Sequence, residues 1–304
     1  MGAINLCFQP FFNWESADAV WKYFLLFLAF ELGRTTDDLS PVYHGTAWGI
    51  ALQVPFLLAQ MYGWDGIAQT AAPAGLFGNK NHLAEAATLV AIAALALRAY
   101  GLFPYIAAAA IIPGSRASLL ALAVAAFYRV ARWNRRWARV IGILAFVIVG
   151  MNAERFAQDN SMRDRAAIWS DTFQGLTWLG NGPGTFRLQY PSHSTHRQVL
   201  LDRPDHPHNE YLMLVYEFGI FGAMFMLISG TWLFVCCRRM EARAPEPYIL
   251  FAGGVLAFFA FPLHLPVTGC LLALAAGHCV AHGPSLRDFF HGRRNRLFPG
   301  RKSG

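Results

Sequence analysis

The sequence predicts an all-α integral membrane protein with about nine transmembrane helices and one large loop. Hydrophobic residues make up 55% of the 304 positions and charged residues only 14%. The mean hydropathy is positive, at +0.34, which lies outside the usual range of soluble proteins. Long apolar runs alternate with short clusters of arginine, as expected for a chain that crosses a bilayer repeatedly.

Nine apolar runs approach the roughly 20 residues that a helix needs to cross a bilayer. They are residues 17–33, 45–62, 81–99, 102–113, 116–131, 138–152, 210–236, 247–265 and 267–282. The runs at 102–113 and 116–131 are short. If these two formed one broken span, the predicted topology upstream of them would invert.

The basic residues predict the orientation of the spans, because Lys and Arg near span ends are retained in the cytoplasm. Three clusters of basic residues can all be placed on the cytoplasmic side. They lie between residues 129 and 139, between 238 and 243, and after 287. Residues 153–207 then form one large external loop, in which six Arg are balanced by six Asp or Glu. Such balance argues against a nucleic-acid surface, and the net charge of +7 favours attraction to anionic inner-leaflet lipid instead.

The predicted organisation has four parts. These are N-terminal transmembrane helices (1–74), a core (75–238) with the external loop 153–207, C-terminal transmembrane helices (239–282) and a basic cytoplasmic tail (283–304). The first residues lack the features of a signal peptide, so we expect the spans themselves to direct insertion. The five cysteines show no paired spacing and are interpreted as small apolar residues.

The sequence PGSRAS, residues 113–118, predicts an anion site at a helix start. Pro113 and Gly114 end one apolar run, Ser115 is a candidate helix cap, and Arg116 falls in the first helical turn. Helix starts attract anions, and an arginine adds a bidentate donor suited to phosphate. The alternative is an interfacial arginine that extends to water.

The sequence SMRDRAAIW, residues 161–169, predicts an amphipathic helix lying on the membrane surface. Arg163 and Arg165 flank Asp164, and Arg165 and Trp169 share one helical face because they are four residues apart. The alternative is a solvated loop helix with local salt bridges.

The sequence GLFGNKNHLAEAA, residues 75–87, places Asn79, Lys80, Asn81 and His82 at the outer end of the third span, with Glu85 one turn deeper. An ionisable residue at that depth is a functional candidate. The structural alternative, which is favoured, has Asn81 capping the helix and Glu85 complementing its positive end.

The sequence LGNGPGTF, residues 179–186, is rich in glycine but lacks the Lys-Ser/Thr and the preceding strand of a phosphate-binding loop. We interpret it as a turn.

Four histidines, His193, His196, His206 and His208, lie within sixteen positions. A zinc site needs three or four converging ligands, and the spacing HxxH followed by HxH is not a zinc pattern, so no metal is predicted. His208 stands at the outer membrane edge just before a helix begins. That position suits a catalytic base for a lipid-linked substrate, whereas His193 and His196 are interpreted as loop residues.

Taken in order, these motifs resemble the O-antigen ligase and O-antigen polymerase (Wzy_C-type) superfamily of bacterial membrane proteins. The matching patterns are GxFxNxNxLA at 75–84, SR at 115–116, RxxxW at 165–169, LGxGxGxF at 179–186, HxHNEYL at 206–212 and ExGxxG at 217–222. Each pattern is weak alone, but their order and the external loop make the combination specific.

The resemblance implies a GT-C-like fold and an inverting, metal-independent glycosyltransferase without a cofactor, at the periplasmic face of the bacterial inner membrane. Its donor would be a glycan on undecaprenyl diphosphate, and its acceptor lipid A core, a growing glycan or a protein. Arg116 and Arg165 would bind the diphosphate, and His208 would activate the acceptor hydroxyl. Further substrate-binding candidates are Arg163, Asn79, Asn81, Trp169, His206, Asn209 and Glu210.

Physical chemistry supports the same roles. A diphosphate leaving group gains negative charge in the transition state, which arginines can stabilise where other transferases use a metal ion. A neutral histidine suits base catalysis. The alternative from another class is a non-enzymatic transporter of lipid-linked sugars, with Arg116 and Glu85 lining its pathway. Family members commonly have more spans in the region that corresponds to residues 1–74.

Overall fold

The computed structural model describes residues 14–134, 136, 140, 160–195 and 204–284. Within these ranges the regular elements are all helical and no strand is present, which confirms the all-α prediction. The elements, in chain order, are α2 (Trp14–Thr35), α3 (Ser40–Ala51), α4 (Val54–Met61), α5 (Lys80–Ala96), α6 (Phe103–Ile111), α7 (Arg116–Trp133), α10 (Asn160–Gln174), α11 (Phe186–His193), α13 (Glu210–Arg239), α14 (Glu246–Phe259), the 3-10 helix η1 (Pro262–His264) and α15 (Pro266–Ala281).

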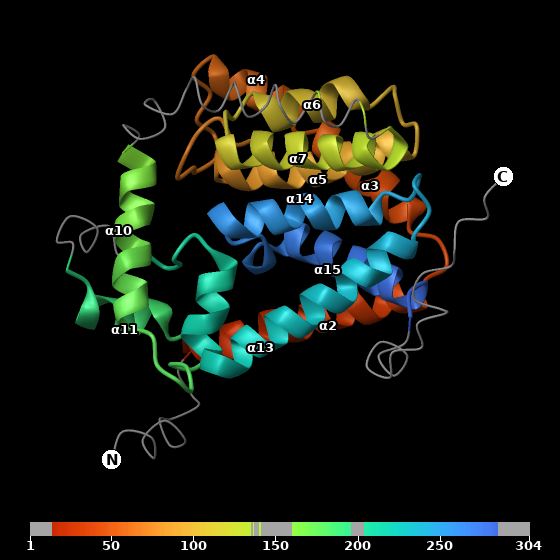
Figure 1. The fold of residues 1–304 in the computed structure, drawn as a ribbon. Coiled ribbons are helices and arrows are strands. Elements are labelled where there is room, and N and C mark those ends of the chain that lie inside the picture. Colours follow the sequence, from red (N-terminus) through yellow and green to blue (C-terminus); the bar gives the residue numbers. More distant parts are fainter. Residues whose placement is uncertain (1–13, 135, 137–139, 141–159, 196–203, 285–304) are drawn as a thin grey trace.

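Helix α5 lies at the centre of one half of the bundle. Its sequence is dominated by alanine, and every residue from Leu83 to Ala94 is buried. Small side chains let neighbouring backbones approach closely, and α3, α6, α7 and α14 all pack against α5 (Figure 1).

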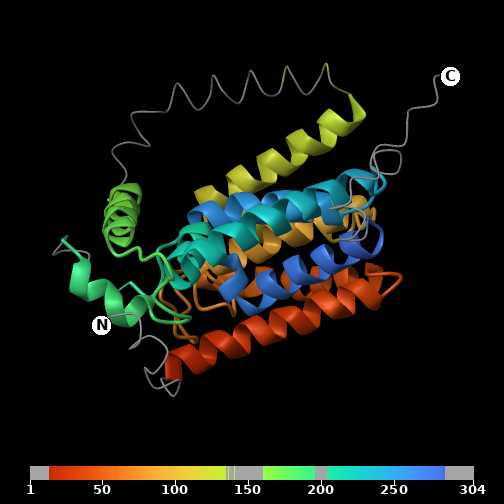
Figure 2. The same cartoon turned by 60° about the horizontal axis from the view of Figure 1, so that its bottom comes forward.

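Helices α2 and α15, from opposite ends of the described chain, lie along each other (Figure 2). Two glycines permit this contact. A Cβ atom added at Gly33 would lie 2.1 Å from the carbonyl oxygen of Leu274, and one added at Gly277 would lie 2.0 Å from that of Phe30. The first and last described helices are therefore held together by backbone packing.

Helix α13 is broken at Gly219, whose φ of 57° and ψ of −136° are not helical. The loop 178–184 fills the break (Figure 1). The amides of Asn181 and Gly182 donate to the carbonyl oxygens of Tyr216 and Glu217, each at 2.9 Å, and the amide of Ile220 donates to the Trp178 carbonyl at 3.0 Å. The glycine-rich sequence is thus a turn that supplies hydrogen bonds to a broken apolar helix.

The predicted span 45–62 is not a single long helix. The run 45–62 is divided into α3 and α4 at residues 52–53. The Gln53 side-chain oxygen accepts from the Leu76 amide at 2.9 Å, and that of Gln60 accepts from the amides of Ala74 and Gly75 at 2.8 Å. These glutamines hold the loop that leads into α5.

The short runs 102–113 and 116–131 are two separate helices, α6 and α7, joined by a turn at 112–115. Among the described residues, α13 is the one helix long and apolar enough to cross a bilayer, and α14 and α15 are shorter apolar helices. The nine spans, their orientation, the external loop and the domain boundaries stay predictions. The candidate span 138–152 lies outside the described residues apart from Val140, and so does the tail beyond residue 284.

Candidate active site

A cavity of about 60 Å³ lies where the first turns of α5 and α7 meet α10, the segment before α13 and the segment after α14. Its lining combines polar and ionisable side chains with aromatic rings. It consists of Asn79, Asn81, His82, Glu85, Ser115, Ala117, Arg165, His208, Phe259, Ala260 and Phe261. Residues from five separate parts of the chain therefore meet at one end of the bundle.

His208 is held in this cavity by an unusual backbone conformation. Its φ is 52°, in the left-handed region that non-glycine residues rarely adopt. The indole Nε1–H of Trp169 donates to the carbonyl oxygen of Pro207 at 2.8 Å. On the other side, Asn209 caps α13, with its Oδ1 accepting from the Leu212 amide at 3.0 Å. Such conformations persist where surrounding contacts fix them, and they cluster at functional sites.

The environment of His208 keeps its imidazole neutral. Burial, followed by the charges of Arg165 and His82, lowers the pKa of His208 to about 4. At neutral pH the ring therefore has a free nitrogen that can accept a proton. Phe261, whose ring centroid lies 5.3 Å away, closes one side of the imidazole.

Arg165 reaches the same cavity from α10. Burial lowers the pKa of Arg165, and the charge of Arg116 acts in the same direction while that of Glu85 opposes it. The two arginines are therefore close enough for their charges to interact. Arg116 begins α7 and is exposed, and its neighbours Ser115 and Ala117 line the cavity. The Ser115 side chain makes no capping bond, because its Oγ accepts from the Ser118 hydroxyl at 3.0 Å.

Glu85 reaches the same cavity from α5. Its side chain is 3% exposed, it lines the cavity, and its Oε2 has no hydrogen-bond partner among the residues that the structure describes. The expected cap at Asn81 is wrong, since Asn79 is the N-cap and its side chain accepts from the Asn81 amide at 2.9 Å. Depth in an apolar helix was the signal that pointed to Glu85.

The remaining candidates divide into exposed and internally bonded residues. Arg163 is exposed on α10. Glu210 is buried, and its Oε1 accepts from the Leu263 amide at 2.8 Å and contacts Nδ1 of His264 at 3.1 Å. Asn209 and Glu210 therefore fix the start of α13 and join it to η1, whereas Asn79 and Asn81 line the cavity itself.

His206 faces a second cavity of about 230 Å³, lined also by Asp18, Lys22, Arg187, Glu217 and His264. Burial, followed by the charges of neighbouring groups beginning with His264, lowers the pKa of His206 to about 3. The ring of His206 lies 4.6 Å from that of Phe261, which also contacts His208. His206 and His208 thus line different cavities.

In the part of the chain that the structure describes, no three potential metal ligands converge. His193 packs between Tyr190 and Tyr216, with ring centroids 5.8 Å from each. His196 lies outside the described residues.

A family model described as O-antigen ligase matches residues 101–227. That range contains Arg116, Arg165 and His208 together with the loop that fills the break in α13. No curated protein matches the chain significantly. Membrane location and glycosyltransferase-type ligase or polymerase activity on lipid-linked glycans are general properties of this family. The match supports an O-antigen ligase-type family for residues 101–227.

Proposed function

We propose that the protein transfers a glycan from undecaprenyl diphosphate to lipid A core at the periplasmic face of the inner membrane, with inversion at the anomeric carbon. Lipid A core is the acceptor under this proposal, and a growing glycan or a protein are the other acceptors that the family allows. The observation that carries the proposal is the meeting of Arg165 and His208 in one cavity beside the first turn of α7.

The arginines serve the donor. Arg116 and Arg165 belong to different helices, yet they are close enough for their charges to interact. A diphosphate carries negative charge that both guanidinium groups attract, and their planar donors match its oxygens. As the leaving group departs its negative charge grows, and the guanidinium groups stabilise it in the transition state without a metal ion.

His208 serves the acceptor. Its free ring nitrogen takes the proton of the acceptor hydroxyl, the hydroxyl oxygen bonds to the anomeric carbon, and the bond from that carbon to the diphosphate oxygen breaks. The electron pair leaves with undecaprenyl diphosphate. Binding of the diphosphate offsets the charge of Arg165, which is a cause of the low pKa of His208. The donor therefore makes His208 a stronger base when it is needed.

The charge distribution supports a periplasmic site. Arg238 and Arg239 end α13, whereas His208 lies just before α13 begins. Arginines at a span end favour the cytoplasmic side, so the cavity would face the periplasm.

The test uses purified protein with undecaprenyl-diphosphate glycan and three acceptors supplied separately: lipid A core, a lipid-linked repeat unit and a peptide. We expect transfer to lipid A core, and a loss of about 10²–10⁴-fold in His208→Ala, the range typical of a general base. His44→Ala is the control, because His44 is exposed and its Nδ1 contacts only the Ser40 carbonyl of its own helix, at 2.8 Å.

Transfer only to a repeat unit or a peptide would reassign the acceptor. Undiminished transfer by His208→Ala would remove the proposed base. Movement of the donor across a bilayer without transfer would favour the transporter interpretation.

A further inference from the structure

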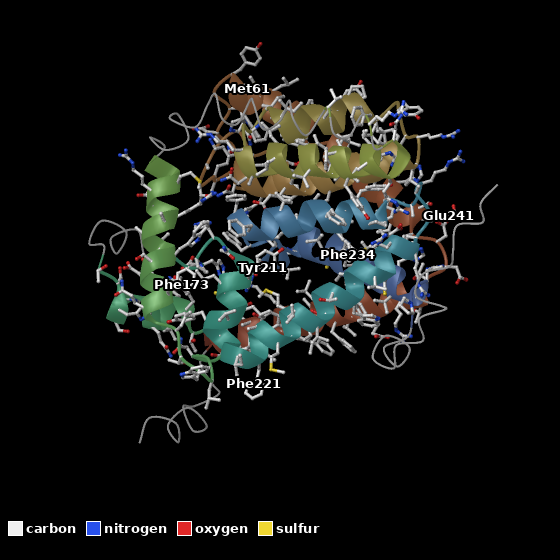
Figure 3. The ribbon with its side chains drawn as sticks, viewed as in Figure 1. Met61, Phe173, Tyr211, Phe221, Phe234 and Glu241 are labelled. Atoms are coloured by element: carbon white, nitrogen blue, oxygen red, sulfur yellow. The ribbon has the colours of Figure 1, made fainter. Side chains whose placement is uncertain are left out.

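Glu85 is a buried ionisable residue that the proposed reaction does not use. It belongs to α5, and its side chain is 3% exposed. It lines the cavity that contains Arg165 and His208. The parts of the chain around this cavity can be followed in Figure 3, in which Phe173 marks α10 and Tyr211 marks the first turn of α13.

Structural roles do not account for a carboxyl group at this position. Glu85 is the sixth residue of α5, beyond the first turn where an acidic side chain stabilises a helix start, and the cap is Asn79. The charge of Glu85 acts on Arg165. Its Oε2 atom nevertheless makes no hydrogen bond with Arg165 or with any other residue that the structure describes. A buried polar atom without a partner lowers stability, and a ligand that enters the cavity can supply the missing partner.

We propose that Oε2 of Glu85 accepts a hydrogen bond from the hydroxyl or amide group on carbon 2 of the sugar next to the diphosphate. Glu85 is then a residue that determines which donor the protein accepts. The inference rests on the proposed function and deepens it.

The position of this group on the sugar follows from the geometry of the reaction. Inversion requires the leaving diphosphate and the incoming hydroxyl to lie on opposite sides of the anomeric carbon. Arg165 holds the first and His208 takes the proton of the second, so the anomeric carbon lies between them, in the cavity that Glu85 also lines. The neighbours of this carbon in the ring are carbon 2 and the ring oxygen. Because the ring oxygen has no hydrogen to donate, the substituent on carbon 2 is the nearest donor for a carboxylate.

Two other roles for Glu85 predict a different dependence on the donor. A residue that only positions Arg165 would support the reaction of every donor equally. A negative charge that stabilises the positive charge developing on the sugar in the transition state would also act on every donor. Only a direct contact with the carbon-2 substituent distinguishes donors that carry this group from donors that lack it.

The test uses three undecaprenyl-diphosphate donors that differ only at carbon 2 of the first sugar, which carries a hydroxyl group, an acetamido group or hydrogen. The discrimination is kcat/KM for the better of the first two donors divided by kcat/KM for the 2-deoxy donor. Removing the substituent also changes the intrinsic reactivity of the sugar, but this change is the same for every variant. Comparing the discrimination between variants therefore isolates the contact.

We expect Glu85→Leu to lower the discrimination about 10- to 100-fold, as for the loss of a hydrogen bond to a charged group. Glu85→Gln keeps an accepting oxygen but no charge, so its discrimination should fall about three- to tenfold. Glutamine is close in size to glutamate, so this variant decides the question if Glu85→Leu does not fold.

The matched control is Thr88→Val, one turn farther along α5. Thr88 is buried like Glu85, but it does not line the cavity, and its Oγ1 donates to the Ser118 carbonyl at 3.5 Å. Thr88→Val should keep the wild-type discrimination. Unchanged discrimination in the Glu85 variants would overturn the assignment, even if their kcat/KM values fell for all donors. Failure of the wild type to transfer from any of the three donors would instead overturn the proposed function.

Discussion

The indole of Trp169 on α10 donates a hydrogen bond of 2.8 Å to the carbonyl oxygen of Pro207, immediately before His208. The same ring lies edge-on to Phe258 of α14, with centroids 5.6 Å apart. Trp169 therefore links the loop helix, the histidine segment and the bundle. We infer that it positions His208 rather than binding substrate directly.

Trp169→Phe tests this positioning role, because it keeps an aromatic ring but removes the N–H donor. We expect kcat to fall about tenfold, which corresponds to the roughly 1.4 kcal/mol of a lost hydrogen bond. The KM for donor should change little. The double variant with His208→Ala should be no slower than His208→Ala alone, since both changes act through one imidazole. Additive losses would show that Trp169 acts independently of His208.

The acid limb of the pH profile reports the environment of His208. Because its pKa is lowered to about 4 in the free protein, the neutral imidazole persists at pH 5 to 6, where an ordinary histidine is largely protonated. We therefore expect kcat/KM to hold down to about pH 5 and to fall as the pH drops through about 4. The limb in kcat should lie at higher pH, because the bound diphosphate raises the pKa of His208. A limb near pH 6.5 in kcat/KM would contradict the buried, cation-flanked histidine.

The identity of the cation at position 165 should matter beyond its charge. Arg165→Lys keeps the positive charge but loses the planar, bidentate donor geometry. We expect kcat/KM for the donor to fall about 10- to 100-fold, the cost of about 1.4–2.7 kcal/mol in transition-state stabilisation. Arg163→Lys, on the exposed part of α10, provides the comparison and should lose less than threefold. Equal losses in both variants would indicate a diffuse electrostatic effect.

Removal of divalent metal should leave the reaction intact. In the proposed mechanism the arginines stabilise the leaving diphosphate, so dialysis against EDTA is expected to leave the initial rate of transfer unchanged. Rates restored only by added Mg²⁺ or Mn²⁺ would assign that stabilisation to a metal ion instead.

The break in α13 should make Gly219 intolerant of substitution. An alanine Cβ would lie 2.2 Å from the Trp178 carbonyl oxygen, and the φ of 57° is itself unfavourable for alanine. We expect Gly219→Ala to lower the free energy of unfolding by on the order of 3 kcal/mol. Gly49→Ala, inside α3 with nothing within 4 Å of the added atom, should be neutral or stabilising by up to about 1 kcal/mol. Thermal unfolding in detergent compares the two, and similar melting temperatures would argue that the loop 178–184 adapts.

The positions of the helices could be predicted from the sequence more readily than the breaks within them. Apolar runs located α2, α5, α7, α14 and α15 because burial and membrane exposure both select apolar residues. The run 210–236 gave no sign of a break, since the amides that stabilise the break belong to a loop more than thirty residues earlier.

For the candidate site too, some features could be predicted from the sequence and others could not. Cationic and histidine motifs suggested which side chains do chemistry, and the structure groups Arg165 with His208. The internal roles of Asn209 and Glu210 were hidden, because the partners of Glu210 at Leu263 and His264 are more than fifty residues away. The burial of Glu85 at the cavity was hidden as well, because a carboxylate near a helix start has a simpler explanation in sequence alone.

The interruption at Gly219 also constrains how the newly made chain reaches its final state. The carbonyl groups of Tyr216 and Glu217 need the amides of the loop 178–184, and unsatisfied carbonyls in hydrocarbon cost several kcal/mol each. We therefore expect residues 210–239 to enter the bilayer as one continuous helix and to bend only when the loop docks. Biogenesis would then pass through an inserted but inactive precursor, and the docking of a short glycine-rich turn would be its maturation step.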